Sequence, residues 1–287
     1  MIDLHIHSNF SDGRLSVEEI IKEAIINNIK VISITDHDNV ESANYILGNS
    51  KNEGIIIIPG VELSAVTYMF GEKLKIHLLG YGYDFKNKRL LDSVAEVYGR
   101  RYEDNKKYID KLIYKLSFMS KDFFTDFDYG KYGWINRKII NQSLPYLTKN
   151  QLEELKNYLN EEKPVYNNYN FPIEEAVEII KISHGYTSLA HPFQIKLSEE
   201  NFQKLIQYLI YLGLDGLETF HKDSSEEERK KLRNDAINYR LYETGGSDFH
   251  TYGYDSSIGS DLKLSDCRLA KKIILAKKDI FGGKYGK

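Results

Sequence analysis

Histidines and carboxylates recur in short segments along this sequence, and these residue types suit metal binding. Six of the eight histidines lie in such segments, which together hold nine candidate metal ligands: His5, His7, Asp12, His37, Glu62, His77, His191, Asp248 and His250. Imidazole and carboxylate groups together suit Zn, Mn or Fe. A cluster this large predicts two or three divalent metal ions, and hence a metal-dependent hydrolase.

The spacing within two of these segments matches one face of an extended strand. His5 and His7 are two residues apart, so on a strand both side chains point to the same side. The same holds for Asp248 and His250 if their segment is extended. A single His-x-His pair can also be incidental, so the prediction rests on the joint placement of all nine residues.

Most of the other candidates are expected at the ends of strands. His37, Glu62 and His191 each come within a few residues after a predicted strand, and Asp12 lies in the loop that follows the first strand. In a parallel barrel the active site collects at this end of the strands. His77 lies within its predicted strand, so its side chain must point inward to join the others.

Short apolar strands alternate with helical segments over most of the chain. The strands are predicted near Ile2–Ile6, Val31–Thr35, Ile55–Pro59, Leu74–Tyr81, Thr187–Ala190, Leu214–Thr219 and Leu241–Gly245. Repeated β-then-α order with nearly continuous apolar strands favours a parallel sheet covered by helices. The predicted fold class is therefore α/β, and this many units makes a closed barrel plausible.

Local signals mark where several helices begin and end. Ser16 and Glu19 have the spacing of a capping box, and apolar residues then follow at helical spacing. A second helix is expected from about Pro172, and a third from a cap at Ser198 to a stop at Gly213.

The stretch 97–170 breaks this alternation. Its apolar spacing is helical throughout, as in Tyr108, Ile109 and Leu112, with charged and polar residues between. We therefore expect a helical insertion at 97–170, between the fourth and fifth strands, and an α/β barrel formed by residues 1–96 and 171–287. The insertion is expected to act as a substrate cap.

Composition excludes few classes of protein. The chain has 287 residues, of which 41% are hydrophobic and 28% charged, with a net charge of −3, so it has no overall basic character for nucleic acid. Cys267 is the only cysteine, which favours a reducing compartment. No apolar run approaches the ~18 residues of a membrane span, and Asp3 and His5 stand where a signal peptide has basic and apolar residues. A cytoplasmic protein is expected.

Taken together, the motifs resemble those of the polymerase-and-histidinol-phosphatase (PHP) family of metal-dependent phosphoesterases. The matching words are Asp3-Leu4-His5-Ile6-His7-Ser8 with Ser11-Asp12-Gly13, Ile34-Thr35-Asp36-His37, Pro59-Gly60-Val61-Glu62, His77-Leu78-Leu79-Gly80-Tyr81, Ala190-His191-Pro192, Leu214-Asp215-Gly216-Leu217-Glu218 and Gly246-Ser247-Asp248-Phe249-His250. They span nearly the whole chain except the insertion.

The resemblance implies a distorted seven-stranded β/α barrel, (β/α)7, that holds two or three ions. It implies three groups of ligands: His5, His7, Glu62 and Asp248; then Glu62, His77 and His191, with Glu62 shared; then Asp12, His37 and His250. Asp36 is expected to orient a histidine rather than to bind metal. Asp12 stands where histidinol phosphatases of the family often have histidine, so the chain is more similar to the branch that acts on nucleotides and short RNA.

The implied reaction is hydrolysis of a phosphate ester by a water that bound metal ions ionise. The expected substrate is a phosphorylated small molecule, a nucleotide such as a nucleoside 3′,5′-bisphosphate, or a short RNA. Glu62 and His191 are expected to be essential for turnover. Histidinol phosphate, cyclic phosphates and a catalytically silent phosphate-binding domain are the alternatives. The oligomeric state, the physiological metal and the choice between monoester and diester stay open.

Further contacts with the substrate are expected outside the ligand set. Arg100, Arg101 and Arg137 of the insertion could bind phosphate through their guanidinium groups, although each could instead lie on a solvated helix face. His221 follows the sixth predicted strand. It is a candidate phosphate contact or acid for the leaving group, with a surface histidine as the alternative.

Overall fold

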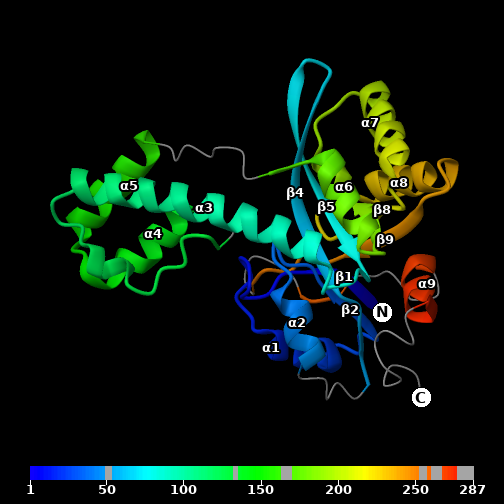
Figure 1. The fold of residues 1–287 in the computed structure, drawn as a ribbon, viewed down its shortest axis with the longest axis horizontal. Coiled ribbons are helices and arrows are strands. Elements are labelled where there is room, and N and C mark those ends of the chain that lie inside the picture. The colour runs from blue at the N-terminus through cyan, green and yellow to red at the C-terminus, as the bar shows by residue number, and fades with distance from the viewer. Residues whose placement is uncertain (49–53, 132–134, 163–169, 252–256, 260–266, 277–287) are drawn as a thin grey trace. The chain divides into compact units, whose positions relative to one another are not determined.

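The computed structural model describes residues 1–48, 54–131, 135–162, 170–251, 257–259 and 267–276. The chain divides into two compact units. Met1–Val94 and Asn170–Lys287 form the first, called here the α/β unit, and Ala95–Tyr169 form the second, called the helical unit. Figure 1 labels the helices and strands of both units.

The described strands lie in two sheets of the α/β unit. The first sheet has the order β1-β2-β3 and the second β6-β4-β5-β7-β8-β9. The bounds are β1 Ile2–Ile6, β2 Val31–Ile34, β3 Ile56–Ile57, β4 Gly60–Met69, β5 Glu72–Tyr81, β6 Phe171–Pro172, β7 Tyr186–Leu189, β8 Gly216–His221 and β9 Tyr242–Gly246. Each of the seven predicted strands has a counterpart, whereas β4 and β6 were not predicted.

The expectation of an all-parallel barrel is wrong in one respect. β5 runs antiparallel to both β4 and β7, while the pairs β1–β2, β2–β3, β7–β8 and β8–β9 are parallel. A tight turn at Phe70-Gly71 joins β4 to β5, and a connection this short allows only antiparallel pairing. Among the described residues the hydrogen-bonded ladder does not close, and isolated bridges Ile6–Phe249 and His37–Glu62 link the two sheets.

Among the residues that the structure describes, six helices of the α/β unit lie on its strands or beside them, and a seventh helix begins in this unit. They are α1 Val17–Ile26, α2 Glu41–Gly48, α6 Ile173–Ile182, α7 Glu199–Leu212, α8 Glu226–Asn238 and α9 Arg268–Ala276, with α3 Lys88–Lys115 starting in this unit. The capping box of Ser16 and Glu19 is present at α1, and Ser198 caps α7. Gly213 ends α7 with φ 118°, which favours glycine.

The core of the α/β unit forms where β1 and β2 meet α1. Ile6, Ile20, Ile32 and Phe249 belong to one buried cluster. At the neighbouring β9, glycine is required at Gly246, since an added Cβ would lie 2.4 Å from the backbone nitrogen of His5. This close approach sets the position of β1 against β9, and therefore the position of His5.

The helical unit continues α3 and adds α4 Ile135–Ser143 and α5 Lys149–Glu161. It has its own core, in which Ile109 and Leu112 of α3 pack with Ile139 of α4 and Leu155 of α5. Within the described parts of the chain, no helix carries an apolar stretch long enough to cross a bilayer.

Candidate metal centre

The first two histidines are positioned by β1. His5 lies in this strand, His7 follows its end, and both are fully buried. Because they are two residues apart on extended backbone, their rings enter the same space, with centroids 5.2 Å apart. Nε2 of His5 and Nε2 of His7 lie 3.1 and 3.2 Å from Oε2 of Glu62.

The hairpin of β4 and β5 brings Glu62 and His77 together. Glu62 pairs with Leu79, and Ser64 pairs with His77, so Glu62 and His77 are diagonal neighbours on one face of the hairpin. Nδ1 of His77 lies 2.9 Å from Oε1 of Glu62. Glu62 follows β3 within a few residues, as predicted, but it also lies buried within β4, a strand that was not predicted.

His191 reaches the same carboxylate from the turn after β7. Its Nε2 lies 3.0 Å from Oε1 of Glu62, the oxygen that also faces His77. The backbone of His191 has φ 27° and ψ 56°, a region that costs a non-glycine residue about 1–3 kcal/mol. Its N–H donates to Oε2 of Glu218 at 2.6 Å, and a charge-assisted bond of this kind supports the strained turn.

A third group of residues surrounds the ring of His7. The rings of His37 and His250 stack on it at centroid distances of 4.5 and 4.2 Å. Nε2 of His250 lies 3.4 Å from Oδ1 of Asp12, and Nδ1 of His37 lies 3.2 Å from Oε2 of Glu62. The loop after β1, the end of β2 and the segment after β9 thus meet at one place.

The loop that carries Asp12 is fixed by Asp36. Oδ1 of Asp36 accepts hydrogen bonds from the backbone N–H of Ser8 at 2.8 Å and from the hydroxyl of Ser11 at 2.6 Å. Its Oδ2 accepts from the hydroxyl of Ser8 at 2.7 Å. These bonds go to the serines of the loop, whereas the sequence predicted that Asp36 orients a histidine.

Asp248 and His221 meet beside His5 and His7. Oδ1 of Asp248 lies 3.0 Å from Nε2 of His7 and 3.4 Å from Nε2 of His5. Asp248 has φ 50°, so its segment is not extended, and the condition for Asp248 and His250 to share one face is not met. The turn nevertheless directs Asp248 into the cluster.

His221 is a buried residue at the end of β8 and not the surface histidine of the alternative reading. Its Nδ1 accepts a hydrogen bond from the backbone N–H of Asp223 at 3.1 Å, and its Nε2 lies 3.2 Å from Oδ2 of Asp248. Since Nδ1 is an acceptor, Nε2 carries the proton and donates to Asp248. The ring therefore contacts the oxygen of Asp248 that faces away from His7.

The cluster contains three groups of residues, and within each group the ligand atoms lie within 4.8 Å of one another. They are His5, His7, Glu62 and Asp248; then His7, Asp12, His37 and His250; then His37, Glu62 and His77. The first equals one predicted set, and the second adds His7 to another. The third contains His37 where the prediction has His191, although His191 contacts Oε1 of Glu62 as closely as His77 does. All nine predicted residues thus converge, and Glu62 is shared.

The carboxylates make this cluster favourable for cations. Burial alone would raise the pKa of Glu62, but the surrounding histidines, His37 first, outweigh it and hold the pKa well below its usual value. Burial alone would lower the pKa of His7, but Asp248 and Glu62 raise it to about 10. Ionised carboxylates therefore face imidazoles that would exchange protons for metal.

Unsatisfied buried atoms show that the residues fit metal ions. Oδ1 of Asp12 and both ring nitrogens of His7 are buried without a hydrogen bond of acceptable geometry among the described residues. This holds although Nε2 of His7 lies 3.0 Å from Oδ1 of Asp248. Buried polar atoms normally have partners, so such a group of imidazole and carboxylate atoms is suited to coordinate cations.

Glu218 is a contact of the cluster that the predicted ligand set omits. This carboxylate lies in β8 with an exposed fraction of 1%, and its Oε1 is 2.9 Å from Nδ1 of His5. The available signal was the segment Leu214-Asp215-Gly216-Leu217-Glu218, which the sequence analysis matched to the family without assigning Glu218 a role. Buried carboxylates are rare unless they are paired.

The three arginines of the predicted substrate contacts all lie in the helical unit. Arg100 is exposed and pairs with Glu96 at 3.7 Å, whereas Arg101 is buried and donates to the carbonyl of Gly130 at 3.2 Å. Arg137 lies in α4, and its side chain is outside the described residues. Their contacts with a substrate stay a prediction.

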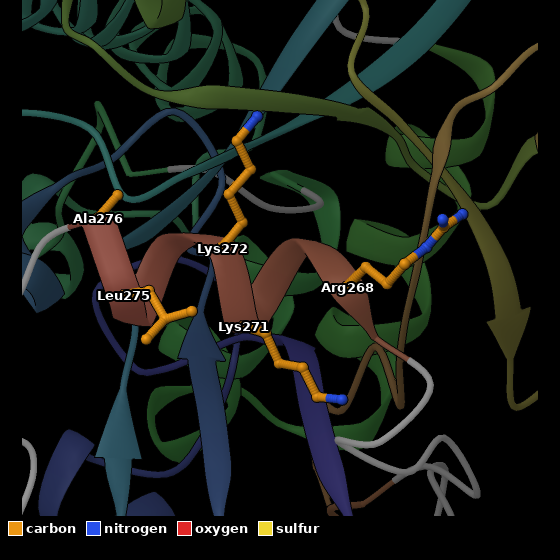
Figure 2. Close-up of a pocket in the computed structure, with 5 residues that line it drawn as sticks. All are labelled: Arg268, Lys271, Lys272, Leu275 and Ala276. Carbon is orange, nitrogen blue, oxygen red and sulfur yellow. The ribbon is translucent and has the colours of Figure 1, made fainter.

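A separate hollow lies on α9 and includes none of the candidate ligands. Arg268, Lys271, Lys272, Leu275 and Ala276 line it. Figure 2 shows that the three basic side chains leave the helix in different directions, so they do not converge on one anion. Nζ of Lys272 instead donates to the hydroxyl of Tyr242 at 3.2 Å.

Comparison with models of known protein families identifies the family to which this chain belongs. The family model for the PHP domain matches residues 3–177, more than half of the chain. The chain belongs to the PHP domain family. The match includes the residues from His5 to His77, while His191, Asp248 and His250 lie beyond it.

Several characterised enzymes are similar to this PHP chain over most of their length. A 5′-3′ exoribonuclease from Haemophilus influenzae is 27% identical, covering 92% of this chain and 95% of its own. A 3′,5′-nucleoside bisphosphate phosphatase from Chromobacterium violaceum is 26% identical, covering 88% of each. A phosphoribosyl 1,2-cyclic phosphate 1,2-diphosphodiesterase from Eggerthella lenta is 24% identical, covering 86% and 93%. The PHP chain is therefore a phosphoesterase.

A solved structure supports the fold. An amidohydrolase from Chromobacterium violaceum with bound sulfate and no metal superposes with a TM-score of 0.74 at 23% identity, covering 95% of each chain. The α/β architecture described above is thus that of known PHP-like structures, whereas the closed seven-stranded barrel is not present among the described strands.

Proposed function

We propose that this phosphoesterase hydrolyses a phosphate ester of a nucleotide, such as a nucleoside 3′,5′-bisphosphate, or of a short RNA. The observation that carries the proposal is the convergence of six buried or half-buried imidazoles and three carboxylates in one cluster, in which Glu62 is shared between ligand groups. The names of the relatives from Haemophilus influenzae and Chromobacterium violaceum support the substrate class.

Glu62 would divide the metal ligands between its two oxygens. Its Oε2 faces His5 and His7, which together with Asp248 would hold one ion. Its Oε1 faces His77 and His191, which would hold a second. The residues Asp12, His37 and His250 would hold a third. The mixed nitrogen and oxygen donors suit Mn, Zn or Fe.

When bound, such ions would polarise phosphoryl oxygens and lower the pKa of water from ~15.7 towards ~7. The protein's own residues set the conditions for this chemistry. Burial of Glu62 removes competing water from its oxygens, and strong hydrogen bonds fix the chain on either side of the ligands. No nucleophilic side chain is required in this scheme.

His221 fits a supporting role better than contact with a phosphate. It is buried and donates to Asp248, so it would hold that carboxylate in place for the metal. The substrate cap formed by the helical unit, with Arg100, Arg101 and Arg137, stays a prediction alongside it.

A cyclic phosphodiester is the second candidate substrate. The relative from Eggerthella lenta acts on a phosphoribosyl 1,2-cyclic phosphate and covers most of this chain. A metal centre of the same composition can serve a monoester or a diester, because the metals contact phosphoryl oxygens that both esters have.

A panel of phosphate esters tests the proposal. The pure protein, loaded separately with Mn²⁺, Zn²⁺ or Fe²⁺, is assayed on nucleoside 3′,5′-bisphosphates, short RNA, cyclic phosphates and histidinol phosphate. We expect the highest kcat/KM on a nucleotide or short RNA. No turnover of any ester by metal-loaded protein would refute the proposed catalysis, and preference for histidinol phosphate would refute the substrate class.

A matched pair of variants links turnover to the cluster. His191 and His184 both have positive φ, which asparagine tolerates, but His184 is exposed and outside the cluster. His191→Asn should remove turnover, while His184→Asn should retain it. Equal activity of the two variants would contradict the assignment of His191.

A further inference from the structure

Glu218 makes two short contacts in different parts of the candidate metal centre. Its side chain is completely buried in β8. Oε1 lies 2.9 Å from Nδ1 of His5, and Oε2 accepts the backbone N–H of His191 at 2.6 Å. The carboxylate of Glu218 thus contacts His5, which faces Oε2 of Glu62, and His191, which faces Oε1 of Glu62.

The contact with His5 selects which ring nitrogen is offered to a metal. A carboxylate accepts hydrogen bonds, so Nδ1 of His5 must carry the proton in this contact. The lone pair is then available at Nε2 once that nitrogen has lost its own proton. Nε2 is the nitrogen that faces Glu62 at 3.1 Å and Asp248 at 3.4 Å.

The contact with His191 acts on the backbone. A residue that precedes proline favours extended backbone. His191 precedes Pro192 but has φ 27° and ψ 56°, so its backbone is far from that preference. A hydrogen bond from its N–H to a buried carboxylate holds this conformation, which sends the ring towards Oε1 of Glu62. Without that bond the turn would be free to relax, and the ring would move with it.

We propose that Glu218 is a positioning residue that couples the two groups of ligands sharing Glu62. The proposal rests on the metal centre of the proposed function and adds a residue that would bind no metal itself. Its contacts reach His5 in one group and His191 in the other. Neither His5 nor His191 belongs to the group of Asp12, His37 and His250, so this third group should depend on Glu218 least.

Glu218→Gln tests the coupling with almost no change in size. Both partners of Glu218 are N–H donors, but an amide offers one oxygen acceptor and one nitrogen donor. If the amide oxygen keeps the His191 contact, its nitrogen forces the His5 proton onto Nε2, where it blocks metal binding. If the oxygen keeps the His5 contact, the N–H of His191 faces another donor. Either arrangement therefore disturbs one of the two ligand groups that share Glu62, the one with His5 or the one with His191.

The readout is the binding of Zn²⁺ alone, measured by competition with a chromogenic chelator. Loss of a residue that orients a ligand typically weakens metal binding about 10- to 100-fold. We expect a loss of this size in at least one of the two sites that share Glu62, and little change at the remaining site. Spectra of ¹⁵N-labelled histidine provide an independent readout, in which the proton of His5 should shift between its ring nitrogens.

Glu243→Gln is the matched control, because it makes the same change one strand away. Glu243 lies opposite Leu217 on β9, is only partly buried, and binds the hydroxyl of Thr219 and the side chain of Arg233. Its Zn²⁺ affinities should equal those of the wild type. If Glu218→Gln does not fold, Glu218→Asp replaces it, since the shorter carboxylate keeps the charge but should not span both contacts.

The possible outcomes separate this inference from the proposed function. Wild-type affinities in Glu218→Gln would overturn the coupling while leaving the metal centre intact. Equal losses at every site, together with a lower Tm of the metal-free protein, would also overturn it and make Glu218 a residue of general stability. Failure of the wild-type protein to bind Zn²⁺ at all would overturn the proposed function itself, and the coupling with it.

Discussion

Replacing Glu62 with glutamine is the most direct perturbation of the cluster, because every candidate group but one includes this residue. Three ring nitrogens lie 3.1–3.2 Å from Oε2, those of His5, His7 and His37. Two more lie 2.9–3.0 Å from Oε1, those of His77 and His191. A glutamine amide keeps one oxygen, so at least two imidazoles face an NH₂ group whichever way it turns.

The size of the effect follows from the burial of this charge. Glu62 has an exposed fraction of 0%, and removing one partner of a buried ionic pair costs about 3–5 kcal/mol. At 1.4 kcal/mol for each factor of ten, this is a loss of roughly two to three and a half powers of ten in metal affinity. Glu62→Asp should lie between the glutamine variant and the wild type, because it keeps the charge but shortens the reach.

Metal content after dialysis, chelator competition and turnover of a phosphate ester measure the effect. Glu19→Gln is the control, since it removes an equal charge from an exposed residue at the start of α1. Circular dichroism of the metal-free variants checks that both fold. Glu62→Gln with wild-type metal affinity and wild-type turnover would refute the argument that Glu62 is shared between ions.

Three further perturbations test other parts of the structure. Gly246→Ala should lower Tm and weaken metal binding, because the new Cβ would lie 2.4 Å from the backbone nitrogen of His5. Overpacking of this kind costs about 1–3 kcal/mol, and each kcal/mol lowers Tm by ~2–4 °C. An unchanged Tm would contradict this reasoning. Asp235→Asn should raise Tm at pH 7 but not at pH 3. Burial raises the pKa of Asp235 in the folded protein above its unfolded value, so the charged carboxylate destabilises the fold. This destabilisation is absent at low pH and develops as pH rises from the unfolded pKa through the folded pKa. Calorimetry at both pH values checks the sign, and a larger gain at pH 3 would reverse the reasoning. Chelation should lower Tm. Mn²⁺ or Zn²⁺ at 100 times the wild-type Kd should restore about 2.7 kcal/mol in the wild type, but much less at the same concentration in Glu62→Gln, whose Kd is higher.

Local patterns in the sequence were sufficient for much of the α/β unit. The capping box at Ser16, the cap at Ser198 and the stop at Gly213 are all present, because each depends on hydrogen bonds or backbone angles within a few residues. The hairpin was harder to predict. β4 was missed and β5 was expected to be parallel, since strand direction depends on how the chain turns at Gly71 and on which neighbours it meets.

Two details of the cluster were misjudged for a similar reason. The argument that Asp248 and His250 share one face required an extended segment, but the φ of 50° puts Asp248 in a turn whose shape depends on packing between β1 and β9. Asp36 was expected to orient a histidine, but it binds the hydroxyls of Ser8 and Ser11. Neither arrangement is visible in the spacing of residues, because each joins segments that are distant along the chain.

The sequence by itself determined the set of donor atoms and the kind of ion they suit, since imidazole and carboxylate chemistry belongs to the residue types wherever they lie. It also determined that His5 and His7 share a face, because alternation along a strand is local. Only the tertiary structure decided which histidine faces which oxygen of Glu62, and that Glu218 lies behind His5 and His191. Those relations depend on the direction and register of β4, β5, β7 and β8, which pairing between distant segments sets.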